Sequence, residues 1–87
     1  MLKIRRRTNG DVVLAVSGSL QACNLDELSG LLGAERGHRG LVLDLRDLVT
    51  VDVDAIRFLC ACEREGIVLR NCPQYVTTWM AREQEPL

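Results

Sequence analysis

The sequence is poor in aromatic side chains, with one Phe, one Tyr and one Trp among 87 residues. Proteins that hold single-stranded nucleic acid stack the bases on aromatic rings, so this scarcity argues against that function. Positive charge is not in surplus either, because the formal net charge is −1. A chain with this balance has no overall attraction to nucleic acid or to an anionic membrane surface. We therefore expect no nucleic-acid partner.

Long apolar runs are also lacking, and none approaches the roughly 20 residues of a membrane-spanning helix. The chain begins Met-Leu-Lys-Ile-Arg-Arg-Arg, which has no apolar core of a signal peptide. These two absences predict no membrane insertion and a cytoplasmic location. The only histidine, His38, falls in a polar stretch and is expected to be solvated rather than catalytic.

Cysteines in the cytoplasm are normally reduced, so the four in this chain are not expected to form disulfides. Cys60 and Cys62 are two residues apart on a predicted helix and would point in nearly opposite directions. They could not chelate one metal ion together. We predict no metal and no cofactor, and a role as small buried apolar side chains for the cysteines, which are Cys23, Cys60, Cys62 and Cys72.

The composition fits one small globular domain covering residues 1–87. Hydrophobic residues make up 47% of the chain and charged residues 26%. The hydrophobic content is sufficient for one core, and the charged content is ordinary for a globular protein.

A β-hairpin is predicted at the start of the chain. Residues 2–7 alternate in character, Asn9-Gly10 is typical of a two-residue turn, and residues 12–17 form an apolar strand. We expect Ser17-Gly-Ser19 to end that strand. The basic run Arg5-Arg-Arg7, with Lys3 nearby, is interpreted as an edge strand whose charges prevent aggregation, with a phosphate-binding patch as the alternative.

Helical spacing then alternates with strand patterns. Asn24 is a candidate N-cap with Glu27 as its capping-box partner. A strand is predicted at residues 41–45, a helix at 53–65 ended by Gly66, a strand at 67–70 and a helix at 75–83. The predicted order is ββαβαβα, which indicates an α/β fold with a small mixed sheet of about four strands and about three helices. Binding sites in such sheets lie beyond the carboxyl ends of the parallel strands, where residues 47–54 form a turn.

Two acids in this turn have a structural and a chemical interpretation. Asp52 could cap the following helix, and Asp54 would be a first-turn acid favoured by the helix dipole. Alternatively, Asp52-Val-Asp54 matches the bare Asp-x-Asp of magnesium-dependent phosphotransfer enzymes. The short remainder of the chain does not supply the further acids and the phosphate clamp of such enzymes. We expect no enzymatic activity and assign no catalytic residue.

The central segment resembles STAS domains, the anti-sigma-factor antagonist modules that also occur at the ends of sulfate transporters. The likeness lies in Val42-Leu-Asp-Leu-Arg-Asp-Leu48 followed by Val51-Asp-Val-Asp-Ala-Ile-Arg-Phe-Leu59. The family has a strand with Asp-Leu there, then Asp-Ser-Ser-Gly-Leu opening a helix. Ser17-Gly-Ser-Leu20 and Gly66-Ile-Val-Leu-Arg-Asn-Cys-Pro73 resemble its flanking segments. The likeness covers nearly the whole chain and implies the STAS fold.

In phosphorylation-switched STAS proteins, a kinase-type anti-sigma factor phosphorylates the second Ser of this motif. Aligned with it, Asp52 matches the family's Asp, Val53 the first Ser and Asp54 the phospho-acceptor Ser. Ala55 replaces the Gly and Ile56 the Leu. The acceptor hydroxyl is therefore missing. Asp54 would act either as a partial mimic of phosphoserine or as part of a docking surface that has lost the switch.

The resemblance implies a non-enzymatic protein-interaction module of bacterial regulatory signalling and transcription control. Its partner would be a kinase-type anti-sigma factor, or alternatively a transporter ATPase of the lipid-transport type. Trp79 and Met80 would form either a homodimer contact or a core-facing stripe. The expected interaction surface is the turn and the exposed face of the second helix, comprising Asp47, Thr50, Asp52, Val53, Asp54, Ala55 and Arg57.

Overall fold

The computed structural model describes residues 2–35 and 40–84, so His38 lies outside the described residues. The predicted α/β class is confirmed, and the described elements follow the order ββαββαβα with one short 3-10 helix, η1. Their bounds are β1 (Leu2–Asn9), β2 (Asp11–Leu20), η1 (Ala22–Asn24), α1 (Leu25–Ala34), β3 (Val42–Asp44), β4 (Leu48–Val51), α2 (Val53–Arg64), β5 (Val68–Arg70) and α3 (Gln74–Gln84).

The sheet is mixed, as predicted, and β2 is its centre. β1 pairs with β2 in antiparallel fashion, and the path continues in parallel through β3 to β5. β4 also pairs in parallel with β2, beyond the end of β3. In the hairpin, Asn9 stands opposite Asp11. The tip is therefore Gly10, with φ of +84°, and not the two-residue Asn9-Gly10 turn that we predicted.

The prediction that Ser17-Gly-Ser19 ends the second strand is wrong. β2 continues to Leu20, and its register with β4 shifts between Gly18 and Ser19. Gly18 has a φ of +87°, which a residue without a Cβ adopts at little cost. This irregularity lets the strand bend and keep pairing instead of stopping.

The segment predicted as a turn between the third strand and the second helix contains β4. Leu48 and Val51 are buried, whereas Val49 and Thr50 between them are exposed. Thr50 pairs with Ser19 and Val51 with Leu20. The described sheet therefore has five strands where about four were expected, and the acidic turn shortens to the residues around Asp52.

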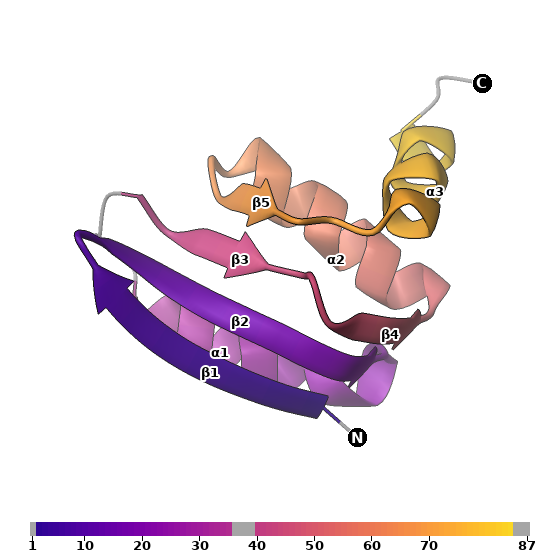
Figure 1. Ribbon diagram of the computed structural model, residues 1–87. Helices are drawn as coiled ribbons and strands as arrows, with labels where there is room; N and C mark the ends of the chain where they lie inside the picture. The colour runs from indigo at the N-terminus through magenta and orange to yellow at the C-terminus, as the bar shows by residue number, and fades with distance from the viewer. Residues whose placement is uncertain (1, 36–39, 85–87) are drawn as a thin grey trace.

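The described helices leave one face of the sheet open. In Figure 1, α1 and α2 lie behind the strands, and α3 lies beyond β5 against α2. The core lies between the sheet and the helices, and its fully buried side chains include Leu14, Leu20, Leu28, Leu43, Leu45, Ile56 and Leu59. None of the described helices is long and apolar enough to cross a membrane.

The helix termini agree with the sequence in part. Gly66 follows α2 with a φ of +92°, as expected of a residue that ends a helix. The capping box predicted for Asn24 and Glu27 is wrong, because Asn24 makes no side-chain cap to α1. Its Oδ1 instead accepts a hydrogen bond of 3.1 Å from the N–H of Gln21. The intervening 3-10 turn changes which backbone group lies within reach.

Candidate functional site

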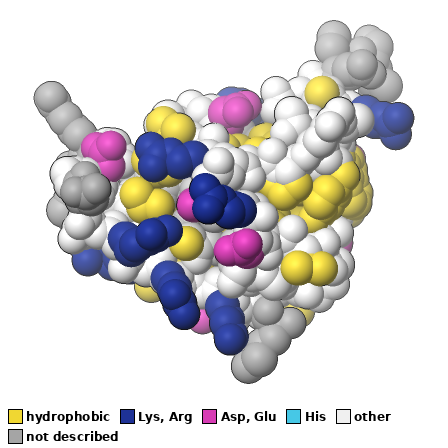
Figure 2. Space-filling view, viewed as in Figure 1, with side chains coloured by type: hydrophobic (Ala, Val, Ile, Leu, Met, Phe, Trp, Pro, Cys, Tyr) yellow, Lys and Arg dark blue, Asp and Glu magenta, His cyan; other side chains and the backbone are white. Residues whose placement is uncertain are grey.

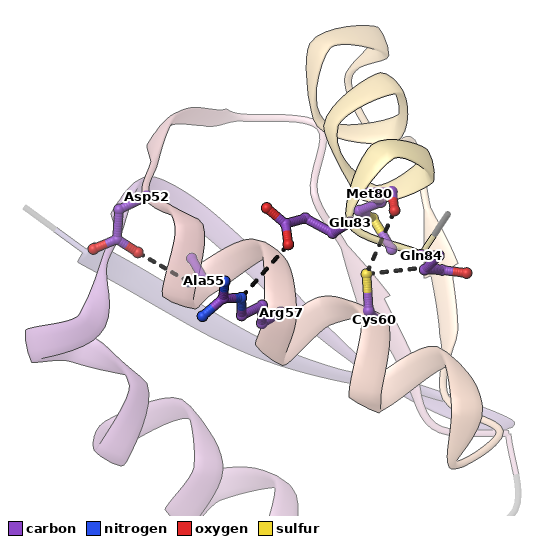
Figure 3. A network of polar contacts seen from close by, with 7 residues as sticks. All are labelled: Asp52, Ala55, Arg57, Cys60, Met80, Glu83 and Gln84. Carbon is purple, nitrogen blue, oxygen red and sulfur yellow. Dashed lines mark hydrogen bonds and ion pairs between the residues drawn. The ribbon is translucent and has the colours of Figure 1, made fainter. Parts of the chain in front are cut away.

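Asp52 holds the turn before α2 in place. The N–H of Ala55 donates to its Oδ1 and the N–H of Ala22 to its Oδ2, both at 2.9 Å. The first bond caps α2, as the structural interpretation predicted. The second links the helix to η1, which lies 30 residues earlier in the chain. Figure 3 shows the Asp52 side chain at the start of α2.

Both carboxylate oxygens of Asp52 are therefore occupied by backbone donors. Hydrogen bonds from Ala22 and then Ala55 hold the pKa of Asp52 below its usual value, since they favour the charged form. A carboxylate whose two oxygens both accept hydrogen bonds from backbone N–H groups of the chain is suited to fixing a turn. It is less suited to attacking a substrate.

Asp54 lies in the first turn of α2 and is exposed. Thr50 and Asp47 are exposed on the same connection, whereas Val53 is partly buried and Ala55 is 0% exposed. The residues predicted as a surface therefore separate into two groups. Asp47, Thr50 and Asp54 face solvent, while Ala55 belongs to the core.

Arg57 continues the exposed face of α2, one turn beyond Asp54. Its Nε lies 3.5 Å from Oε2 of Glu83 on α3 (Figure 3). The Arg57 side chain is 66% exposed, so this ion pair is screened and adds little to stability. Asp54, Arg57 and Arg64 are all exposed on α2, at intervals of three and seven residues that place them along one side of the helix.

A groove of about 340 Å³ runs between α2 and α3 beside this helix face. Its lining residues are Arg57, Cys60, Arg64, Glu83 and Gln84. Among these lining residues, only Arg57 was predicted from the sequence to belong to the interaction surface. The others come from two helices, and their proximity depends on how α3 packs, which no local pattern indicates.

Cys60 joins the two helices beneath the groove and is 2% exposed. Its thiol donates to the carbonyl of Met80 at 3.9 Å, and Nε2 of Gln84 donates to its sulfur at 3.1 Å (Figure 3). Cys62 is also 2% exposed, and burial, followed by the charge of Glu65, raises its pKa to about 11. Both thiols are core groups, as predicted.

The prediction of a buried apolar role is wrong for Cys23, which is exposed on η1. Cys72 is partly buried, and the four cysteines are free. Within the described ranges, no three His, Cys, Asp or Glu side chains come together as potential metal ligands.

Tyr75 was missed by the sequence analysis as a support of the site. Its hydroxyl lies 3.2 Å from the carbonyl of Leu48 and 2.9 Å from that of Val49, to which it can donate. α3 thereby steadies the strand that leads into the acidic turn. Val49 itself is 72% exposed and adds an apolar side chain to this end of the molecule. The only signal was the position of Tyr75 at the start of the last helix.

The stripe on α3 faces inward. Val76 and Met80 are buried, and Trp79 packs against the core with part of its surface accessible. This confirms the core-facing interpretation of Trp79 and Met80, and the suggested homodimer stays a prediction.

Comparison with solved structures identifies a related architecture. The chain superposes on the crystal structure of an uncharacterized protein of the DUF3478 family from Shewanella loihica PV-4, described as having a SpoIIAA-like fold. The TM-score is 0.54 with 17% sequence identity, over 98% of this chain and 80% of that one. The chain has a SpoIIAA-like fold.

The SpoIIAA-like fold is the STAS fold that the sequence resemblance implied. At 17% identity the likeness establishes architecture alone. No protein-family model matches the sequence. No curated protein matches it either.

Proposed function

We propose that this SpoIIAA-like chain is a non-enzymatic interaction module of bacterial regulatory signalling. It binds a protein partner through the turn before α2 and the exposed side of that helix. The observation that supports the proposal most directly is the different environment of Asp52 and Asp54. Asp52 is bound on both oxygens by the backbone, and Asp54, two residues later, is free to meet a partner in solvent.

The surface has the properties of a specific docking site. It is held by Asp52 on one side and by Tyr75 on the other, so little ordering entropy is lost on binding. Exposed Asp54, Arg57 and Arg64 present charges of both signs, which select a partner with the complementary pattern. The adjacent groove can accept a side chain of that partner.

The STAS resemblance places Asp54 at the phospho-acceptor position, so this surface would have no reversible switch there. One carboxylate carries less charge than a phosphate, which brings about −1.5 to −2 at pH 7, and fewer acceptor oxygens. We therefore favour a permanently available docking surface over a full phosphate mimic.

The test is a pull-down from lysate of the source organism with wild type, Asp54→Lys and the matched control Asp26→Lys. Asp26 is also an exposed acid in the first turn of a helix, but that helix is α1. We expect mass spectrometry to find a sigma-regulator or kinase-type partner that is lost with Asp54→Lys and retained with Asp26→Lys. Retention of every partner by both variants would contradict the assigned surface.

The identity of the partner separates the two candidate functions. If the partner lost with Asp54→Lys is a transporter ATPase, the assigned binding surface stands and the function becomes that of a transporter subunit. Asp54→Asn and Asp54→Ser then test the charge itself. Binding that survives both substitutions would contradict phosphate mimicry and support a plain docking site.

A further inference from the structure

Positively charged side chains lie together on the face of the sheet that the described helices leave open. Lys3, Arg5 and Arg7 alternate along β1 on this side, and Arg70 of β5 lies on the same side. The residues of β2 that pair with the β1 cations are small, namely Val13, Ala15 and Ser17. Figure 2 shows lysine and arginine side chains gathered on this face, although the chain as a whole carries a net charge of −1.

These cations form no ion pair with a described carboxylate. Across residues 2–35 and 40–84, no carboxylate lies within 4.0 Å of the charged nitrogens of Lys3, Arg5, Arg7 or Arg70. The acids on this side include Asp11, two residues before Val13 on β2, and Asp44, whose Oδ1 accepts hydrogen bonds from the N–H of Arg46 and the amide of Asn71. Asp44 and Arg7 also attract each other electrostatically, without an ion-pair contact. Arg6, the remaining cation of the basic run, points to the other face and pairs with Glu35.

β1 is also an edge of the sheet. Within the described chain it pairs only with β2, and it is eight residues long, compared with three for β5 at the opposite edge. Such an edge presents unpaired backbone N–H and C=O groups. Along its helix-covered side, Leu2 and Ile4 pack on the core but stay partly accessible.

We propose that the edge of β1 accepts an extended segment of an acidic partner protein as an additional strand. Acids of that segment would stand opposite Lys3, Arg5 and Arg7, and aliphatic residues opposite Leu2 and Ile4. Both β1 and an added strand repeat their side chains every second residue, so one alternating acidic and aliphatic segment satisfies both faces. Opposite charges facing each other across strands then add to the backbone hydrogen bonds.

The same pattern disfavours other occupants. A second copy of β1 would bring like charges onto the same face, so the charges that prevent self-association also select an acidic strand. Nucleic acid would find no aromatic platform on this face. A membrane would meet Val13, Ala15 and Ser17 rather than the large apolar side chains that enter a bilayer, and Asp44 would face its anionic headgroups.

The proposal is independent of the docking site at Asp54, because β1 lies on another part of the molecule. The probe is a synthetic capped peptide in which glutamates alternate with valines, compared with a peptide of equal composition whose glutamates are grouped together. We expect calorimetry to show tighter binding of the alternating peptide, weakening with salt as exposed charges are screened.

Arg5→Glu tests the charge pairing and should weaken binding of the alternating peptide by about tenfold, since it turns attraction into repulsion. Arg82→Glu is the matched control, because it changes net charge equally at an exposed position on α3 and should leave binding unchanged. Equal loss with both variants would overturn the proposal.

Backbone pairing is tested by two alternating peptides N-methylated at either the odd or the even residues. Only one of the two sets of N–H groups faces β1, so one methylated peptide should lose binding and the other should keep it. Equal binding of both would overturn strand addition. Stronger binding to phosphatidylserine vesicles or to single-stranded DNA than to the alternating peptide would overturn the acidic protein as occupant.

Discussion

The two faces of the sheet are built from the same strands and have opposite characters. Leu14 and Leu43 on the helix-covered face are 1% and 0% exposed, whereas Arg5 on the open face is exposed and Val68 is 52% exposed. Alternation along β1 and β2 separates packing from recognition, whereas in β3 Val42, on the open side with Val68, is also buried at 2% exposure. A substitution should therefore affect stability or binding according to the face it occupies.

The largest expected effect is on the covered face. Leu43→Ala removes a side chain with no exposed surface from a central strand and should lower the free energy of unfolding by about 2–5 kcal/mol. Urea denaturation followed by circular dichroism measures this change. A loss below about 1 kcal/mol would mean that the covered face is loosely packed, contrary to the burial described above.

A smaller effect is expected at the turn, and it depends on pH. The pKa of Asp52 is lowered in the folded protein, so its contribution to stability is present above the unfolded pKa, near the ordinary value of 3.8. That contribution is lost as pH falls through the lower folded pKa. Wild type should therefore lose more stability than Asp52→Asn as pH falls from about 5 through the lowered pKa of Asp52.

Denaturant midpoints at a series of pH values measure this difference. Asp54→Asn is the control, because Asp54 is exposed and the backbone bonds that hold Asp52 are intact in that variant. Parallel pH profiles for wild type and Asp52→Asn would contradict the bridging role of Asp52.

The smallest effect is expected on the open face. Val68→Thr keeps a β-branched side chain of similar shape at a position that is already half exposed, so stability should change by less than about 0.5 kcal/mol. The same urea experiment applies. A loss as large as that of Leu43→Ala would show that the open face is covered in solution, for instance by a second copy of the chain.

Much of the fold could be predicted from local patterns. The alternation of residues 2–7 and the run at 41–45 indicated strands, and the spacing of Leu59 and Cys60 with Ala55 and Ile56 indicated the buried side of α2. The strand β4 was not predicted, because it is four residues long and lies between two acidic turns. Its existence depends on pairing with the far end of β2, which continues past Gly18.

The candidate site was predicted only in outline. The capping role of Asp52 follows from its place before a helix, but its second bond, to Ala22, joins distant segments that only the folded chain brings together. Glu83, Gln84 and Tyr75 entered the site through the packing of α3. A short amphipathic helix reveals which side is apolar and does not reveal which neighbour it meets.

The bond between Asp52 and Ala22 also bears on how the chain folds. The β1–β2 hairpin joins residues close in sequence and can form early, whereas every partner of β2 on its other side must first close a long loop. Closure of that loop, which the Asp52 carboxylate completes across 30 residues, should limit the folding rate. Until then the basic hairpin would exist as a separate nascent unit, already carrying its alternating charges.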